Sequence, residues 1–153
     1  MKSLVPALAL LAVSCGGGGG PSTDPVPATP LAGTFDGKPW TAAKGTASAR
    51  SFNDPGERWI DISSTALACS TFGGEAQLIG TVPWTTGASY EFGFTKNLTF
   101  VVRTDGGVDN KVATTGRMEI ISAPDAGTGT IRLRARFGGD FSVEGEVQVE
   151  VCD

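Results

Sequence analysis

The side chains that could carry out chemistry are few, because the chain of 153 residues contains no histidine. Its serines and threonines therefore lack their usual general base, and no lysine stands out as a replacement. Paired carboxylates could hydrolyse sugars, but no pair lies in an apolar strand context that would raise a pKa. Asp61 lies between Ile60 and Ile62 and is expected on the opposite, solvent-facing side of its strand. We therefore predict that the protein is not an enzyme.

Metal binding is not predicted either. Two cysteines without histidine make a poor zinc site. The acidic stretch Asp105–Asn110 offers oxygen ligands for Ca²⁺, but it lacks the twelve-residue loop with a terminal glutamate. A hairpin turn is the simpler interpretation, so we expect no metal and no cofactor.

Tryptophan side chains are the remaining candidates for contact with a ligand. Trp59 precedes the alternating pair Ile60 and Ile62, and Trp84 follows Pro83 near a loop. An exposed tryptophan on a β-scaffold can stack against a sugar or against a side chain of a partner. The alternative is that Trp59 and Trp84 both cover the rim of the core or pack against the segment that precedes the domain.

The N-terminus has the proportions of a secretory signal peptide. Lys2 precedes an apolar run from Leu4 to Val13 that is too short to span a bilayer. The sequence Leu-Ala-Val-Ser-Cys that ends at Cys15 resembles the lipobox of bacterial lipoproteins. This resemblance implies cleavage before Cys15 and a lipid on its sulfur, and Gly16 in place of Asp implies sorting to the outer membrane. An ordinary signal peptide with a chance cysteine is the alternative.

The segment after Cys15 is predicted to be a flexible tether. It contains five consecutive glycines and four prolines with a single charge, so it buries too little apolar area to offset the entropy of ordering. The expected organisation is a signal peptide over residues 1–14, an acylated cysteine with its tether over 15–30, and one domain over 31–153.

The two other cysteines are expected to pair. With Cys15 lipidated, Cys69 and Cys152 remain, and an exported protein lives where disulfides persist. We predict a Cys69–Cys152 disulfide, with two free buried thiols as the alternative.

The charge balance excludes one class of partner. The chain has 12 basic and 16 acidic residues and no basic run. Nucleic-acid binding therefore lacks its electrostatic footprint, and the predicted link to the membrane rests on Cys15.

Residues 31–153 predict an all-β domain, either an antiparallel β-sandwich or an open barrel. Short strand-like runs alternate with Gly, Asp and Pro turn residues, and no long segment has a helical period. The expected strands are 58–62, 76–82, 89–94, 98–104, 117–122, 130–137 and 141–151. We expect 89–94 and 98–104 to form a hairpin.

The first hairpin has a predicted register. Asp36-Gly37 is a favourable two-residue turn, because both central residues need a positive φ. It pairs Phe35 with Lys38 and places Trp40 in the core.

The last hairpin also has a predicted register. A three-residue loop over 138–140 keeps both apolar faces aligned, and it sets Arg134 opposite Glu144 and Arg132 opposite Glu146. We interpret the result as a solvated face on which acids neutralise the arginines. An anion-binding strip is the alternative.

Both ends of the domain resemble those of many small bacterial lipoprotein domains without an assigned activity. The resemblance is carried by Gly37-Lys38-Pro39-Trp40 and by the glycine-rich hairpin from Gly138 to Cys152. It implies a β-sandwich or open barrel and no chemistry. We therefore expect an outer-membrane lipoprotein that acts as a non-catalytic binding module for an extracellular or periplasmic partner, such as a glycan. The alternatives are a structural envelope protein without a small ligand and a carboxylate-dependent hydrolase.

Overall fold

The computed structural model describes residues 24–50, 54–66, 68–69, 74–93 and 96–152, in which all regular secondary structure is β-strand, as predicted. The predicted signal peptide and Cys15 lie outside the described residues. In the described part of the chain, no helix has the length and apolar character needed to cross a membrane. The strands are β1 (Ala32–Phe35), β2 (Lys38–Thr41), β3 (Lys44–Ser48), β4 (Glu57–Ser63), β5 (Ala76–Pro83), β6 (Ser89–Glu91), β7 (Leu98–Thr104), β8 (Gly107–Val112), β9 (Thr115–Ser122), β10 (Gly127–Arg136) and β11 (Ser142–Cys152).

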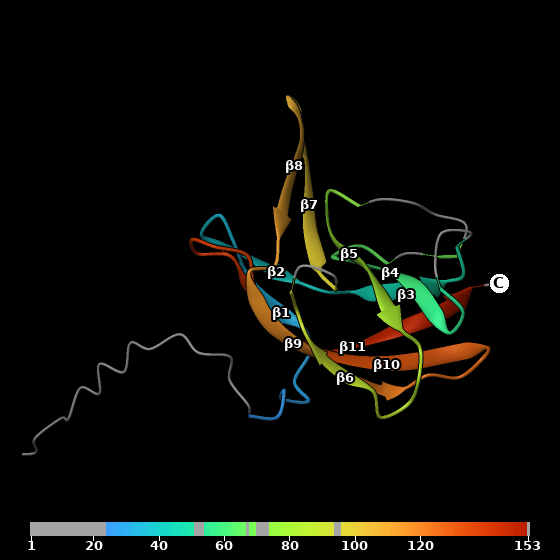
Figure 1. Ribbon diagram of the computed structural model, residues 1–153. Coiled ribbons are helices and arrows are strands. Elements are labelled where there is room, and N and C mark those ends of the chain that lie inside the picture. The colour runs from blue at the N-terminus through green and yellow to red at the C-terminus, as the bar shows by residue number, and fades with distance from the viewer. Residues whose placement is uncertain (1–23, 51–53, 67, 70–73, 94–95, 153) are drawn as a thin grey trace, which may run out of the picture.

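The strands form one strongly curled, open sheet (Figure 1). Their order is β6-β9-β10-β11-β3-β4-β5-β7-β8, with β1 beside the first part of β11 and β2 beside β1. The expectation of antiparallel strands needs one correction, because β3 runs parallel to the end of β11. Strand β3 was missed because Lys44-Gly45-Thr46 shows no apolar alternation.

Both predicted hairpin registers are confirmed. Phe35 lies opposite Lys38, and the turn residues Asp36 and Gly37 have φ values of 49° and 70°. In the last hairpin, Arg134 lies opposite Glu144 and Arg132 lies opposite Glu146.

The predicted hairpin between 89–94 and 98–104 is wrong. Strand β6 pairs with β9 instead, and β7 pairs with β5 and β8. The partner of β6 is thus distant in sequence, so nothing in the local turn chemistry could reveal it.

The concave side of the curl holds the core. Aromatic rings join the β1–β2 hairpin to the far side of the sheet: Phe35 stacks on Phe100 at 5.1 Å between ring centroids, and Trp40 meets Phe100 edge-on at 5.3 Å. Trp40 is buried, as predicted. The inward residues of β10 and β11, among them Ile131 and Val149, are buried in the same core.

The end of the expected tether belongs to the folded part of the chain. Val26 is only 2% exposed, and Glu146 of β11 donates its backbone N–H to Thr29 and accepts one from Leu31. The close approach depends on Gly145, whose φ is +134° and where a Cβ would lie 2.5 Å from the Thr29 carbonyl oxygen. Residues 26–30 therefore form a short strap across β11.

Candidate functional site

The convex face of β4, β5 and β7 carries a small cavity beside Trp59. Its volume is about 180 Å³. Trp59 lies directly opposite Thr81, and its side chain is partly exposed. The cavity is lined by Trp59, Ile79, Gly80, Thr81, Lys96, Asn97 and Thr99. One aromatic ring and one isoleucine thus stand among hydroxyl, amide and ammonium groups, a combination that suits a small polar ligand with an apolar face.

Lys96 is held in place beside this cavity. Its ammonium lies 3.1 Å from the carboxylate of Glu57 on β4 and 5.9 Å from the ring centroid of Tyr90. Burial, and to a lesser extent Glu57, raise the pKa of Tyr90 above its ordinary value, so the phenol is neutral. The sequence did not indicate that Lys96, Glu57 and Tyr90 lie close together, because these residues come from three separate segments that carry no motif.

Trp84, the other tryptophan proposed as a ligand contact, is buried. Its side chain is 9% exposed, its indole N–H donates to the Pro124 carbonyl at 2.9 Å, and its ring packs over Gly129. The expectation of an exposed platform at Trp84 therefore needs correction. The large apolar ring of Trp84 packs against β10, so Trp59 is the tryptophan that remains a candidate for contact with a ligand.

Asp61 also departs from the expectation. It does face the side of β4 opposite Ile60 and Ile62, but that side is covered, and Asp61 is 6% exposed. One of its carboxylate oxygens, Oδ1, has no hydrogen-bond partner among the described residues. Burial raises the pKa of Asp61 to about 6, against the opposing influence of Arg103 and then Arg50.

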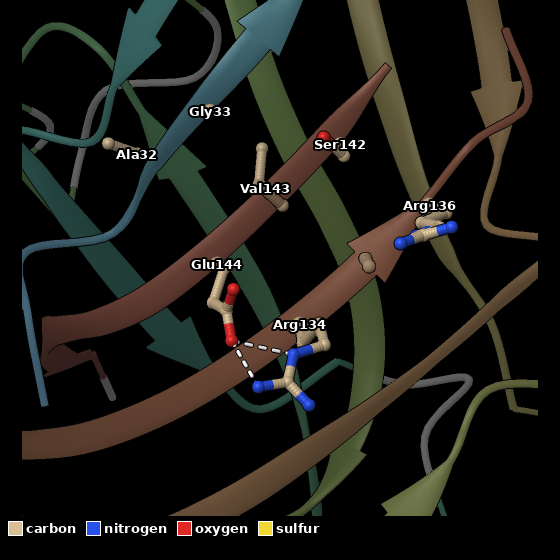
Figure 2. Close-up of a pocket in the computed structure, with 8 residues that line it drawn as sticks. Ala32, Gly33, Arg134, Arg136, Ser142, Val143 and Glu144 are labelled. Atoms are coloured by element: carbon tan, nitrogen blue, oxygen red, sulfur yellow. Dashed lines mark hydrogen bonds and ion pairs between the residues drawn. The ribbon is translucent and has the colours of Figure 1, made fainter. Parts of the chain in front are cut away.

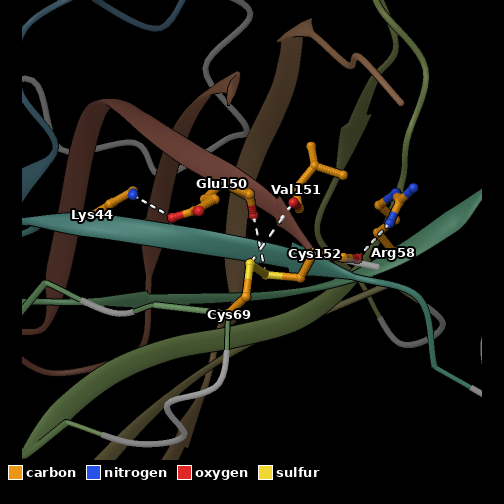
Figure 3. The surroundings of a disulfide bond; sticks show 6 residues. All are labelled: Lys44, Arg58, Cys69, Glu150, Val151 and Cys152. Atoms are coloured by element: carbon orange, nitrogen blue, oxygen red, sulfur yellow. Dashed lines mark hydrogen bonds and ion pairs between the residues drawn. A yellow bond between two sulfur atoms is a disulfide. The ribbon is translucent and has the colours of Figure 1, made fainter. Parts of the chain in front are cut away.

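Near this region, the disulfide between Cys69 and Cys152 ties a residue outside the sheet to the end of β11, as the cysteine count predicted (Figure 3). Cys152 ends β11, and its carbonyl accepts a hydrogen bond from the Arg58 guanidinium at 3.1 Å. The N–H of Gly74 donates to the side chain of Gln77 at 3.0 Å. The polar side chains of this region are buried: Thr46, Asp61, Ser63 and Gln77.

A second cavity, of about 450 Å³, opens on the convex side of β1, β10 and β11 (Figure 2). Arg134 forms an ion pair with Glu144 there, and Arg132 pairs with Glu146 at 2.8 Å. Arg136 is exposed and lies opposite Ser142 rather than an acid. The arginine row is thus largely neutralised by the glutamates, which agrees with a solvated face rather than an anion-binding strip.

Side chains that could bind a metal or act as paired carboxylates are few among the described residues that line these two cavities. Within the residues that the structure describes, no three metal-ligating side chains gather in one place. The Trp59 cavity has no carboxylate in its lining, and the β1–β10–β11 cavity has only Glu144. Asp105 and Gly106 form the turn between β7 and β8, and Asp109 pairs with Lys111 at 3.0 Å.

Comparisons with known proteins leave the site to be interpreted on its own geometry. No protein-family model, no curated protein and no solved structure matches this chain.

Proposed function

We propose that this chain is an outer-membrane lipoprotein anchored through Cys15, and that its open half-barrel is a non-catalytic binding module for a glycan. The observation that carries the binding role is the cavity beside Trp59. The sequence that ends at Cys15 supports the anchor, because a small residue directly precedes the cysteine and a glycine-rich stretch follows.

The cavity is suited to one sugar ring rather than to a long oligosaccharide. Its volume of about 180 Å³ is below the range of about 300–1,000 Å³ typical for drug-sized ligands. In our proposal the indole of Trp59 stacks against the apolar face of the ring. Thr81, Thr99 and Asn97 then hydrogen-bond to its hydroxyl groups, and the Lys96 ammonium, whose charge is already paired with Glu57, supplies a further donor.

Fluorescence tests the binding role directly. Trp40 and Trp84 are buried, so Trp59 is the tryptophan that a ligand can reach. We would titrate the purified full-length protein with soluble peptidoglycan fragments and with an acidic and a neutral disaccharide. We expect saturable changes in emission with the wild type and with Ile121→Ala, which alters an exposed residue outside the cavity. Because Trp59→Ala also removes the reporter, its expected loss of binding is measured by calorimetry, with the wild type binding in the same assay. Absence of binding to every probe contradicts the module and favours a structural envelope protein.

Lipid labelling tests the anchor separately. Cells grown with a labelled fatty acid should incorporate it into the wild type and not into Cys15→Ala, and only the wild type should sediment with membranes. A Cys15→Ala protein that still carries the label and stays membrane-bound contradicts the anchor, whatever the result with sugars.

A further inference from the structure

Strand β8 forms an edge of the sheet and projects from the body of the domain. In Figure 1 the β7–β8 hairpin extends away from the rest of the sheet. One side of β8 pairs with β7, with Val108 opposite Arg103 and Val112 opposite Thr99. The two-residue turn at Asp105 and Gly106 places the backbone groups of residues 108, 110 and 112 toward the other side, where no described strand lies.

The exposed edge is apolar at both ends. Val108 is 55% exposed and Val112 is 50% exposed, and these are the two most exposed large apolar side chains in the described part of the chain. Both lie on the same face of β8, with Asn110 between them. An unpaired edge with exposed apolar residues is a template for another strand.

The sequence of β8 is complementary to itself when read in the reverse direction. The residues are Val108-Asp109-Asn110-Lys111-Val112, with valine at both ends and opposite charges on either side of the central asparagine. An antiparallel pair of such strands centred on Asn110 places each Val108 against Val112 of the other strand. The same register places each Asp109 directly opposite Lys111.

We infer that the β8 edge is a homodimer interface in which two copies of this chain join their sheets across a two-fold axis at Asn110. The register uses the unpaired backbone groups of residues 108, 110 and 112 for inter-strand hydrogen bonds. It also forms two apolar cross-strand pairs on one face and two ion pairs on the other. A second copy satisfies all three requirements at once.

The charges on β8 are compatible with this pairing. Within one chain Asp109 and Lys111 already lie 3.0 Å apart, both at least partly exposed. Two such pairs brought together in the antiparallel register form a square of alternating charge. A parallel arrangement, or a shift by two residues, loses the match of acid to base, so the pattern selects one register.

Cysteine cross-linking tests the register. In an antiparallel hydrogen-bonded pair, the Cα atoms at the two-fold axis are about 5.5 Å apart, which is within the reach of a disulfide. We expect Asn110→Cys in the purified full-length protein to form a disulfide-linked dimer under mild oxidation. Val108→Cys is the matched control, because its two copies would be separated by four residues along the strands, about 14 Å. Equal cross-linking of both variants, or none with Asn110→Cys, overturns the proposal.

Exchanging the charges of Asp109 and Lys111 tests whether the partner strand belongs to a second copy of this chain. Asp109→Lys and Lys111→Asp each place like charges opposite one another, so sedimentation should show each variant as a monomer at concentrations where the wild type is dimeric. The double exchange D109K/K111D restores the match and should restore the dimer. Melting temperatures of the variants distinguish loss of the interface from loss of the fold. A wild type that stays monomeric, or single variants that remain fully dimeric, contradicts a homodimer through β8.

Discussion

Two regions of the same convex surface handle polar residues in opposite ways. Over β9, β10 and β11, arginines and glutamates form ion pairs within and between strands and stay partly exposed, although the Nε atom of Arg117 is buried and Arg117 lies opposite Arg134. Over β3, β4 and β5, polar side chains are buried, and Asp61 keeps an oxygen without a hydrogen bond. In the first region the contacts come mainly from neighbouring strands, with one addition from outside the sheet: the Asp24 carbonyl accepts a hydrogen bond from Arg134 at 3.5 Å. The second region adjoins the disulfide that ties Cys69 to the end of β11.

The difference shows what an alternating pattern can and cannot reveal. Alternation in β4 correctly separates Ile60 and Ile62 from Asp61. It does not show whether the second face meets water or another segment of the chain, because that depends on contacts distant in sequence. A buried polar face costs free energy unless its groups are paired, so the two regions should respond differently to substitution.

Removal of the disulfide should have the largest effect. Cys69 and Cys152 are 83 residues apart, and in the chain-entropy model closing a loop of that length stabilises the fold by about 4.5 kcal/mol. We expect the double variant Cys69→Ser/Cys152→Ser to lose that order of unfolding free energy in a urea titration.

Reduction of the wild-type protein should lower its stability to a similar degree, while leaving the double variant unchanged. If the double variant and the wild type unfold at the same urea concentration, the stability of the fold does not depend on the Cys69–Cys152 disulfide.

The hairpins were predictable because their information is local. Asp36-Gly37 and Gly138-Gly139 specify their turns, and the faces of β10 and β11 then set the register. Strand β8 was interpreted as a loop because its residues are polar on one face and its position is at an edge. The Trp59 cavity was predictable only in part: Trp59 itself was identified, but Lys96 and Glu57 meet there through tertiary packing.

Neutralising Asp61 should have the next largest effect, and it should stabilise the protein. The pKa of Asp61 is about 6 in the folded state against an ordinary value of 3.8, so between these pH values the folded state holds a proton that the unfolded state releases. The free energy of unfolding therefore falls as the pH rises from about 4 to 6, and it stays low above pH 6. Two pKa units correspond to about 3 kcal/mol.

Asp61→Asn removes this titration. We expect the variant to be more stable than the wild type at pH 7 and the difference to shrink toward pH 4, as measured by urea unfolding across that range. Asp140→Asn, an exposed control, should keep the wild-type profile. A parallel pair of pH profiles for Asp61→Asn and the wild type would refute a buried, ionised Asp61.

The strap that residues 26–30 form across β11 should depend on Gly145, which lies against it. Gly145→Ala places a Cβ against the Thr29 and Pro30 carbonyl oxygens and demands a positive φ of an alanine. We expect a loss of about 1–3 kcal/mol in unfolding free energy, with faster proteolysis near residues 26–30. Gly37→Asn is the control, because asparagine tolerates the left-handed conformation and no atom lies within 4 Å of its Cβ position. Equal stability of Gly145→Ala and the wild type would show that the strap does not need the close approach.

The smallest effect on the free energy of unfolding is expected from removing an ion pair on the charged face of β10 and β11. Arg132 and Glu146 are each 29% exposed, so water and salt screen their attraction, and exposed cross-strand pairs contribute only a few tenths to about 1 kcal/mol. We expect Arg132→Gln and Glu146→Gln to cost less than about 1 kcal/mol each, and their double-mutant coupling to shrink further in 1 M NaCl. A coupling well above that value, or one that is insensitive to salt, would mean that this face is shielded like the region around Asp61. The contrast between the two convex surfaces would then disappear.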